Sequence, residues 1–341
     1  MKRIALCIGL GILLSMSTVV YAKNSEVSET QNTYESELTG LEIDSNIKNK
    51  RPVAIMIDNE LKALPHFSVG EADIVYEMMN STANKRITRL MCLYKDYENI
   101  DRIGSVRSVR PTHIPIASEY NAILIHEGGP ALYISEPLSN DWIDDLNGGF
   151  SRLKNGKSME FTEFVLQGEV DEHARKSKVS LDYNDYKPKR NNHFCFSDEV
   201  ILNLTYKFAL SNTIIDLQDV YPHTQSKLEY NADTLTYDYY LYNILQKDSE
   251  DADVVSFKNI ILQCADCTEL DANGYMEYDI TGKGKGYYFV NGNYIPITWE
   301  KLDETAITKF YDINDNEVNI AKGKTYINII PSEYWDKIIL K

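Results

Sequence analysis

The feature that most restricts the fold is a series of short apolar runs in the first half of the chain. Each run ends at polar residues or a turn, and each is shorter than a typical buried helix. Runs of this kind are typical of strands that are buried within a sheet. The runs are Val53–Ile57, Ile74–Met78, Ile87–Tyr94 and Ala122–His126.

Two segments have the pattern of helices. Pro111–Tyr120 carries proline in its first turn, where the missing N–H has no cost. Ser197–Leu210 begins with a suitable N-cap and repeats apolar residues at helical spacing, which predicts an amphipathic helix. Because strands and helices alternate, we expect residues 51–212 to form an N-terminal layered domain of the α/β type.

The sequence changes character at about residue 213. Tyrosines become frequent, polar and apolar residues alternate, and the segment Phe289–Ile295 carries Asn291-Gly292 at its centre. Asn-Gly supplies the positive φ angles that a type I′ hairpin turn requires. Residues 213–341 therefore predict a smaller, mainly antiparallel β domain with its own core, and the fold class is α+β.

The first 50 residues have the pattern of an export signal followed by a tether. Lys2 and Arg3 precede an apolar stretch, and small residues end at Ala22, so we expect cleavage of residues 1–22 by a signal peptidase. The alternative is an uncut membrane anchor, for which the stretch is slightly short. Residues 23–50 are polar and aperiodic, which predicts a flexible linker.

The net charge argues against nucleic acid as a partner. The whole chain has a charge of −16, and removal of the two basic residues of the signal leaves 33 basic against 51 acidic residues, or −18. Such a chain is repelled by nucleic acids and anionic membranes. We therefore expect a secreted or extracytoplasmic, envelope-associated protein that meets the membrane only transiently, through its signal peptide.

The cysteines and histidines do not form a recognisable metal or cofactor site. Four cysteines follow the signal, and their disulfide state is left open: Cys92, Cys195, Cys264 and Cys267. The Cys264–Cys267 spacing suits zinc or redox chemistry, but no second pair stands nearby. The series Asp312, Asn314 and Asn316 lacks the glycine and glutamate of a calcium loop, so it predicts a turn. We expect no metal and no cofactor.

Several strings resemble the YerB-like family, a group of bacterial envelope proteins with two domains of unknown function. The strings include Arg51-Pro-Val-Ala-Ile-Met-Ile-Asp-Asn59, Ala72-Asp-Ile-Val-Tyr-Glu77, Ile103-Gly-Ser-Val-Arg-Ser-Val-Arg-Pro111, His126-Glu-Gly-Gly129 and Gly282-Lys-Gly-Lys-Gly-Tyr-Tyr-Phe-Val-Asn-Gly292. The resemblance implies an extracytoplasmic two-domain protein and no particular reaction. Family members are often lipoproteins, whereas Cys7 of this chain lies inside the apolar stretch, away from a lipidation position.

An island of positive charge is the main functional clue. Residues 102–113 hold Arg102, Arg107, Arg110 and His113 without any acidic residue. The planar fork of arginine pairs with carboxylate or phosphate in a bidentate manner. If Pro111 opens a helix, Arg107 and Arg110 flank its N-terminus. The alternative is that these arginines pair internally with Asp58, Asp73 or Glu77.

Further polar residues stand on or after the apolar runs and are expected at one edge of the sheet, where ligands settle. With the two arginines they make up the predicted ligand-binding set: Asp58, Asn59, Glu77, Arg89, Arg107, Arg110 and His126. Structural alternatives remain open, namely a turn for Asp58 and Asn59, a salt bridge for Glu77 and a structural role for His126.

Three functions remain open. The first is binding of an anionic cell-wall or lipid-linked ligand that carries phosphate or carboxylate. The second is an envelope hydrolase or transferase that acts on such a ligand, with Asp58, Glu77 or His126 as acid or base. The third is a non-catalytic scaffold for envelope proteins. Binding is favoured, because the arginine island is visible and a nucleophile–base pair is not.

Overall fold

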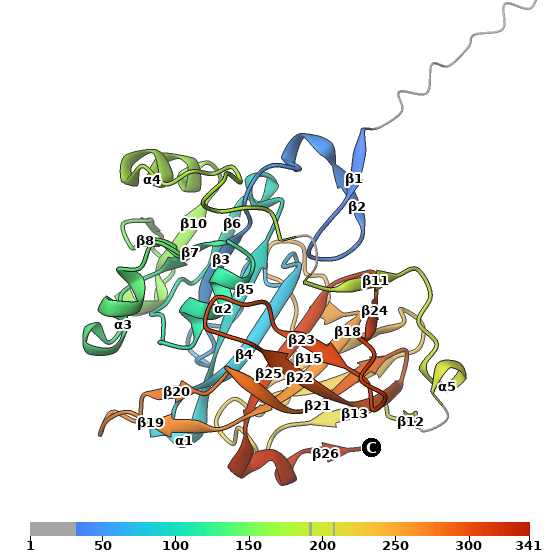
Figure 1. Cartoon of the computed structure of the whole chain (residues 1–341). Coiled ribbons are helices and arrows are strands. Elements are labelled where there is room, and N and C mark those ends of the chain that lie inside the picture. Colours follow the sequence, from blue (N-terminus) through green and yellow to red (C-terminus); the bar gives the residue numbers. More distant parts are fainter. Residues whose placement is uncertain (1–31, 191–192, 207–208) are drawn as a thin grey trace, which may run out of the picture. The chain divides into compact units, whose positions relative to one another are not determined.

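The computed structural model describes residues 32–190, 193–206 and 209–341. Its largest element is a mixed eleven-stranded sheet that takes strands from both halves of the chain (Figure 1). Ten strands follow one another across it, and β23 (Lys309–Tyr311) pairs with β22. In order they are β12 (Leu210–Ser211), β22 (Asn293–Lys301), β21 (Gly282–Val290), β18 (Asn259–Ala265), β25 (Thr325–Pro331), β4 (Ile74–Ser81), β5 (Ile87–Tyr94), β3 (Val53–Asp58), β7 (Ile123–His126) and β8 (Asp144–Asn147).

The four apolar runs of the first half form neighbouring strands of this sheet, and their prediction as buried strands is confirmed. They correspond to β3, β4, β5 and β7, and every residue in these strands is buried. A strand that is covered on both faces is mostly apolar on both, which explains why these runs show no regular polar alternation. A sheet-rich α+β fold is confirmed, whereas a layered α/β arrangement of the first half stays a prediction.

The second half of the chain contributes a strand to the middle of this sheet. Strand β25 lies between β4 and β18 and pairs in parallel with both, so that Ile327 stands opposite Tyr76 and Ile261. Residues 32–341 form one unit. The central sheet and its hydrophobic core therefore extend across residue 213, and the division of the chain into two domains at that residue stays a prediction.

A second, six-stranded sheet covers one face of the central sheet. Tyr239 in its strand β15 hydrogen-bonds Glu77 of β4 at 2.6 Å. Side chains alternate along a strand, so the neighbouring Tyr76 points to the other face, where its hydroxyl lies 2.8 Å from that of Tyr120. The strands of the second sheet are β16 (Ile244–Leu245), β15 (Thr236–Leu241), β14 (Lys227–Asn231), β13 (Ile214–Asp216), β26 (Ile339–Leu340) and β17 (Ser256–Phe257).

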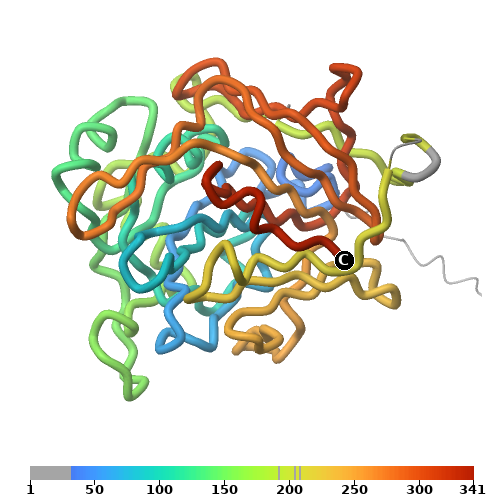
Figure 2. Tube along the Cα trace, turned by 90° about the horizontal axis from the view of Figure 1, so that it is seen from below, coloured from blue at the N-terminus to red at the C-terminus, as the bar shows by residue number. Residues whose placement is uncertain are grey.

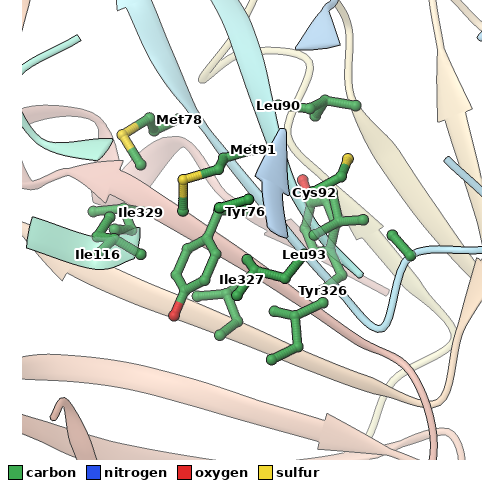
Figure 3. Packing of buried hydrophobic residues seen from close by; sticks show 14 of the residues in the cluster. Tyr76, Met78, Leu90, Met91, Cys92, Leu93, Ile116, Tyr326, Ile327 and Ile329 are labelled. Atoms are coloured by element: carbon green, nitrogen blue, oxygen red, sulfur yellow. The ribbon is translucent and has the colours of Figure 1, made fainter. Parts of the chain in front are cut away.

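The face that carries Tyr76 is closed by apolar packing. Figure 3 shows Tyr76, Met78 and Met91 grouped with Ile116 of the helix that follows the arginine island. Ile116 is 1% exposed, and the strand residues around it are equally buried. This packing fixes the end of the arginine island against the sheet.

A buried ionic cluster joins the same helix to the second half of the chain. Glu119 Oε1 accepts hydrogen bonds from Lys301 at 2.9 Å and from the hydroxyl of Thr308. Its Oε2 accepts the backbone N–H of Thr308 and lies 3.0 Å from His193. Although burial opposes ionisation, Lys301 and His193 lower the pKa of Glu119 to about 2. The two halves are therefore held together by charge as well as by the sheet.

The remaining strands form small sheets. They are β6 (Arg102–Gly104), β10 (Glu163–Leu166) and β9 (Ser151–Arg152) in one sheet, and the pairs β1 (Thr33–Glu35) with β2 (Glu42–Asp44), β11 (Cys195–Ser197) with β24 (Asn319–Ala321), and β19 (Cys267–Glu269) with β20 (Met276–Tyr278). The β19–β20 hairpin, orange in Figures 1 and 2, lies beside the turn that joins β4 to β5.

The described helices are short. They are α1 (Ala83–Arg86), α2 (His113–Glu119), α3 (Ala131–Leu138), α4 (Glu169–Ser177) and α5 (Leu202–Thr205), with the 3₁₀ helices η1 (Ser45–Ile47), η2 (Tyr97–Asn99), η3 (Met159–Phe161) and η4 (Ser332–Lys337). Helix α2 confirms the prediction for Pro111–Tyr120. Among the described residues, no helix is long and apolar enough to cross a membrane.

Two local predictions are wrong. The helix expected over Ser197–Leu210 reduces to α5, because Cys195–Ser197 and Leu210–Ser211 pair with distant strands instead. The linker expected over residues 23–50 is ordered from residue 32, because Glu37 forms a buried ion pair with Lys95 at 2.7 Å. The predicted signal peptide and residues 23–31 lie outside the described residues.

Two predicted turns are confirmed. Asn291 and Gly292 have φ angles of 52° and 70° and join β21 to β22 as a two-residue turn, with Val290 opposite Asn293. The carboxylate of Asp312 accepts the backbone N–H groups of Asn314 and Asn316, so this segment closes on itself as a turn.

Candidate functional site

The arginine island lies along the end of β3. The backbone N–H of Arg107 donates to Met56 at 2.9 Å, and that of Asp58 donates to Ser105 at 3.1 Å. Arg89 stands opposite Asp58 in the register of β5 and β3. The sheet therefore brings together residues that are far apart in sequence.

Asp58 is the acidic centre of this group. Its side chain is 1% exposed, and its Oδ2 lies 2.7 Å from Arg107 Nε and 3.8 Å from Arg89 Nη2. Arg107 also pairs through Nη2 with Glu160 at 2.5 Å. Arg89 donates from Nη1 to the carbonyl of Ser108, and burial lowers its pKa to about 10. Part of the internal pairing considered from the sequence is thus present.

Arg110 is different, because no carboxylate among the described residues pairs with it. It is 7% exposed, and the only hydrogen bond of its guanidinium to the described residues runs from Nη1 to the carbonyl of Val109 at 2.8 Å. Its guanidinium carbon lies 4.5 Å from the ring centre of Tyr275, and its Nε has no hydrogen-bond partner in the part of the chain that the structure describes. Burial, together with Arg89 nearby, lowers the pKa of Arg110 to about 9.

These residues line one cleft with a volume of about 590 Å³, which we call the arginine cleft. Its charged lining consists of four basic side chains, Arg89, Arg107, Arg110 and Lys62, and three acidic ones, Asp58, Glu60 and Glu160. The chain as a whole carries an excess of acidic residues. In the cleft, basic side chains outnumber acidic ones. The buried arginine without a carboxylate partner among the described residues is Arg110.

Glu77 and Asn59 lie behind the cleft and do not line it. Glu77 is wholly buried and accepts hydrogen bonds from four hydroxyl groups and from the amide of Asn59. The hydroxyl donors belong to Thr88, Ser226, Tyr239 and Tyr326. Tyr239 and Ser226 come from the second sheet or its edge, so Glu77 fastens the two sheets together. The salt bridge considered as its alternative role is not formed with any described residue.

His126 is also outside the cleft. It is wholly buried, with Nδ1 2.8 Å from the carbonyl of Gly128 and Nε2 3.1 Å from Asp145. These contacts hold the loop after β7 against β8. Of the seven predicted residues, the structure therefore brings Asp58, Arg89, Arg107 and Arg110 together and leaves Asn59, Glu77 and His126 apart.

Several residues that line the cleft were not predicted from the sequence. Glu160 stands on η3, in a stretch whose elements had no clear pattern, and Tyr275 stands on the β19–β20 hairpin. Both reach the cleft from segments more than 50 residues away from Arg107. A single sequence carries no signal for such encounters.

The histidines and cysteines of the described residues do not line the arginine cleft. Among them, no group of three His, Cys, Asp or Glu side chains is placed to hold a metal ion. The four described cysteines are free, and burial raises the pKa of Cys267 to about 12. A thiol of that kind is a poor nucleophile at neutral pH.

Comparisons with known proteins found similar sequences and a similar structure that cover both halves of the chain. Two family models match the chain, the N-terminal domain of "Protein of unknown function (DUF3048)" over residues 38–180 and its C-terminal domain over residues 215–327. A protein of Bacillus subtilis (strain 168) named "Putative lipoprotein YerB" is 25% identical over 344 residues, which cover 96% of this chain and 94% of that protein. The crystal structure of the YerB protein from Bacillus subtilis has a TM-score of 0.76 at 21% identity, over 90% of this chain and 99% of that one.

Proposed function

The chain belongs to the YerB-like family, which carries the two DUF3048 domains of unknown function, and on this premise we propose that it is an exported cell-envelope protein that binds an anionic ligand in the arginine cleft. The ligand carries a phosphate or carboxylate and belongs to the cell wall or to a lipid-linked intermediate. Two features support an extracytoplasmic location, namely the signal-like sequence of residues 1–22 and the lipoprotein name of the relative.

The observation that carries the binding proposal is the state of Arg110. A charged group that leaves water loses hydration, and a protein normally compensates with a partner of opposite charge. Arg107 has two carboxylates and Arg89 lies 3.8 Å from one, whereas Arg110 has a single carbonyl and a tyrosine ring. An anion in the cleft supplies the missing partner.

Arginine also suits the geometry of such a ligand. The guanidinium has five N–H donors in a planar fork, and a carboxylate or phosphate can accept two of them at once. Arg110 uses one nitrogen for Val109, so the rest of its fork remains for a ligand. Binding lifts the pKa of Arg110 back toward its ordinary value, because a neighbouring anion favours the charged form.

We favour binding over catalysis because of the positions of the three candidate acids and bases. Glu77 and His126 are wholly buried outside the cleft. Asp58 borders it, but two arginines hold this carboxylate. A general base must reach the proton that it removes, and two of the three candidates have no route to a ligand in the cleft.

The proposal is tested by a thermal-shift screen of phosphorylated and wall-derived compounds on the exported protein. A compound at 100 times its Kd stabilises the folded state by about 2.7 kcal/mol. We expect anionic compounds to raise the melting temperature. We expect the same compounds to raise it less in Arg110→Lys, which keeps the charge but loses the planar fork. Hits that are equally strong in Arg110→Lys, or hits confined to neutral compounds, would exclude the arginine cleft as the anion site.

A further inference from the structure

The arginine cleft has a second set of polar groups that a simple anion does not need. They come from two turns, the one between β4 and β5, with Asn80, Ser81 and Asn84, and the end of the β19–β20 hairpin, with Asn273 and Tyr275. Uncharged amides and hydroxyls are poor partners for a bare phosphate compared with arginine. Their presence calls for a ligand with groups of its own beyond the anion.

These two turns are fastened to each other. Ser81 forms a backbone bridge with Tyr275, and its hydroxyl donates to the carbonyl of Asn273 at 2.9 Å. The N–H of Thr82 donates to the carbonyl of Gly274 at 3.0 Å. The amide groups therefore sit on one wall that both halves of the chain build, and this wall is fixed before a ligand arrives.

Asn80 shows what this wall lacks. It is 5% exposed, and its Oδ1 accepts no hydrogen bond from the described residues. A buried acceptor without a donor costs free energy, so native proteins rarely retain one without a reason. An amide oxygen accepts only from an N–H or O–H group. A ligand that satisfies Asn80 must therefore carry such a donor.

The remaining lining limits the ligand further. Its aliphatic and phenyl side chains are Ala83, Ile87, Phe161 and Ala272, of which Ile87 and Phe161 are 6% and 3% exposed. Guanidinium groups lie near two of the aromatic rings, Arg107 near Phe161 and Arg110 near Tyr275. Little apolar surface is left for an acyl chain or a nucleobase, while a cleft of about 590 Å³ holds more than a single anionic group.

From these observations we infer that the ligand is an anionic saccharide. Its phosphate or carboxylate meets Arg89 and Arg110, and a hydroxyl or N-acetyl N–H meets Asn80 on the amide wall. Glu60, whose carboxylate lies 3.1 Å from His223 at the rim, is an acceptor for a further hydroxyl. This inference rests on the proposed function and adds the chemical class of the ligand.

Calorimetric titration with four matched probes tests it. The probes are N-acetylglucosamine 1-phosphate, glucuronate, inorganic phosphate and N-acetylglucosamine. We expect at least one of the two sugar anions to bind ten times or more tightly than both inorganic phosphate and the neutral sugar. The affinities of these two probes compare a phosphate with a carboxylate on similar sugar rings.

Two variants separate the parts of the site. Arg110→Lys should lower the affinity for the sugar anion and for inorganic phosphate alike, because both bind to the guanidinium fork. Asn80→Leu replaces an unpaired amide with a side chain of similar size. It should lower the affinity for the sugar anion about tenfold and leave the affinity for inorganic phosphate unchanged. Retention of the wild-type melting temperature by Asn80→Leu shows that the variant is folded.

The possible failures are distinct. If inorganic phosphate binds as tightly as both sugar anions, or if Asn80→Leu weakens every probe equally, the saccharide inference is wrong and anion binding stands. If no probe binds, or if the neutral sugar binds as tightly as its anionic counterparts, the proposed function fails and the inference fails with it.

Discussion

Arg107 and Arg110 are three residues apart in one cleft, and the structure predicts opposite consequences for their removal. Arg107→Ala separates Asp58, whose side chain is 1% exposed, from its ion pair at 2.7 Å and leaves only Arg89 at 3.8 Å. Breaking a buried pair typically costs about 3–5 kcal/mol. Because Arg107 itself is 24% exposed and Arg89 remains, we expect a loss near the lower end of that range.

Arg110→Ala should cost much less stability. It removes one hydrogen bond, with a net value of about 1 kcal/mol, and one cation–π contact worth about 0.5–1 kcal/mol. Against these losses stands the relief of a buried charge next to Arg89. We therefore expect the free energy of unfolding to change by less than about 1 kcal/mol.

Ligand binding should respond in the reverse order. Each hydrogen bond between Arg110 and an anion contributes about 1.5–3 kcal/mol, which corresponds to an affinity loss of about 10- to 150-fold for one lost bond. Urea unfolding and calorimetric titration with N-acetylglucosamine 1-phosphate measure both quantities on the same samples. Arg175→Ala is the matched control, since Arg175 is an exposed arginine on α4 outside the cleft.

The refuting result is equally clear. If Arg110→Ala destabilises the protein as much as Arg107→Ala does, and if the affinity of Arg110→Ala equals that of Arg175→Ala, then Arg110 is a structural residue. The reasoning from its missing carboxylate would then be wrong.

Four further predictions concern other parts of the molecule. Glu160→Gln should raise the affinity for anions, because it frees Arg107 from an exposed competitor; calorimetry measures the gain, and an unchanged or lower affinity contradicts it. Stability that depends on ionised Glu119 is present above a pH of about 4.5 and is lost as the pH falls toward 2, so the melting temperature of Glu119→Gln should start lower and fall less over that range; a parallel fall contradicts this. An isolated fragment of residues 213–341 should lack a cooperative unfolding transition, because β25 loses its parallel partner strand β4. A sharp transition would instead show that residues 213–341 have a core of their own. N-terminal sequencing of the exported protein should find Lys23 first, whereas an intact segment before it would point to an uncut anchor.

Strands and turns that depend on short stretches of sequence were predicted correctly. Short apolar runs became β3, β4, β5 and β7, and the Asn291-Gly292 turn formed as expected. Ser197–Leu210 failed because pairing with β24 and β22 outweighed helical periodicity, and the start of the ordered chain at residue 32 depends on a remote lysine. Long-range pairing of this kind leaves no periodic trace in one sequence.

The candidate site shows the same division. The absence of acidic residues between Arg102 and His113 identified two arginines of the cleft, and a strand end identified Asp58. Glu77 and His126 also follow or end apolar runs, but the pleat points Glu77 toward the second sheet, and His126 is held by Asp145 of β8. Which face a strand residue takes depends on what covers the sheet, and the sequence does not state that.

A crystal structure of the protein soaked with N-acetylglucosamine 1-phosphate tests the central claim most directly. We predict the phosphate within hydrogen-bonding distance of Arg89 and Arg110, with a donor of the sugar facing Asn80 Oδ1. An arginine cleft without ligand at a saturating concentration, or a phosphate bound at another place on the protein, would contradict the claim that this cleft is the anion site.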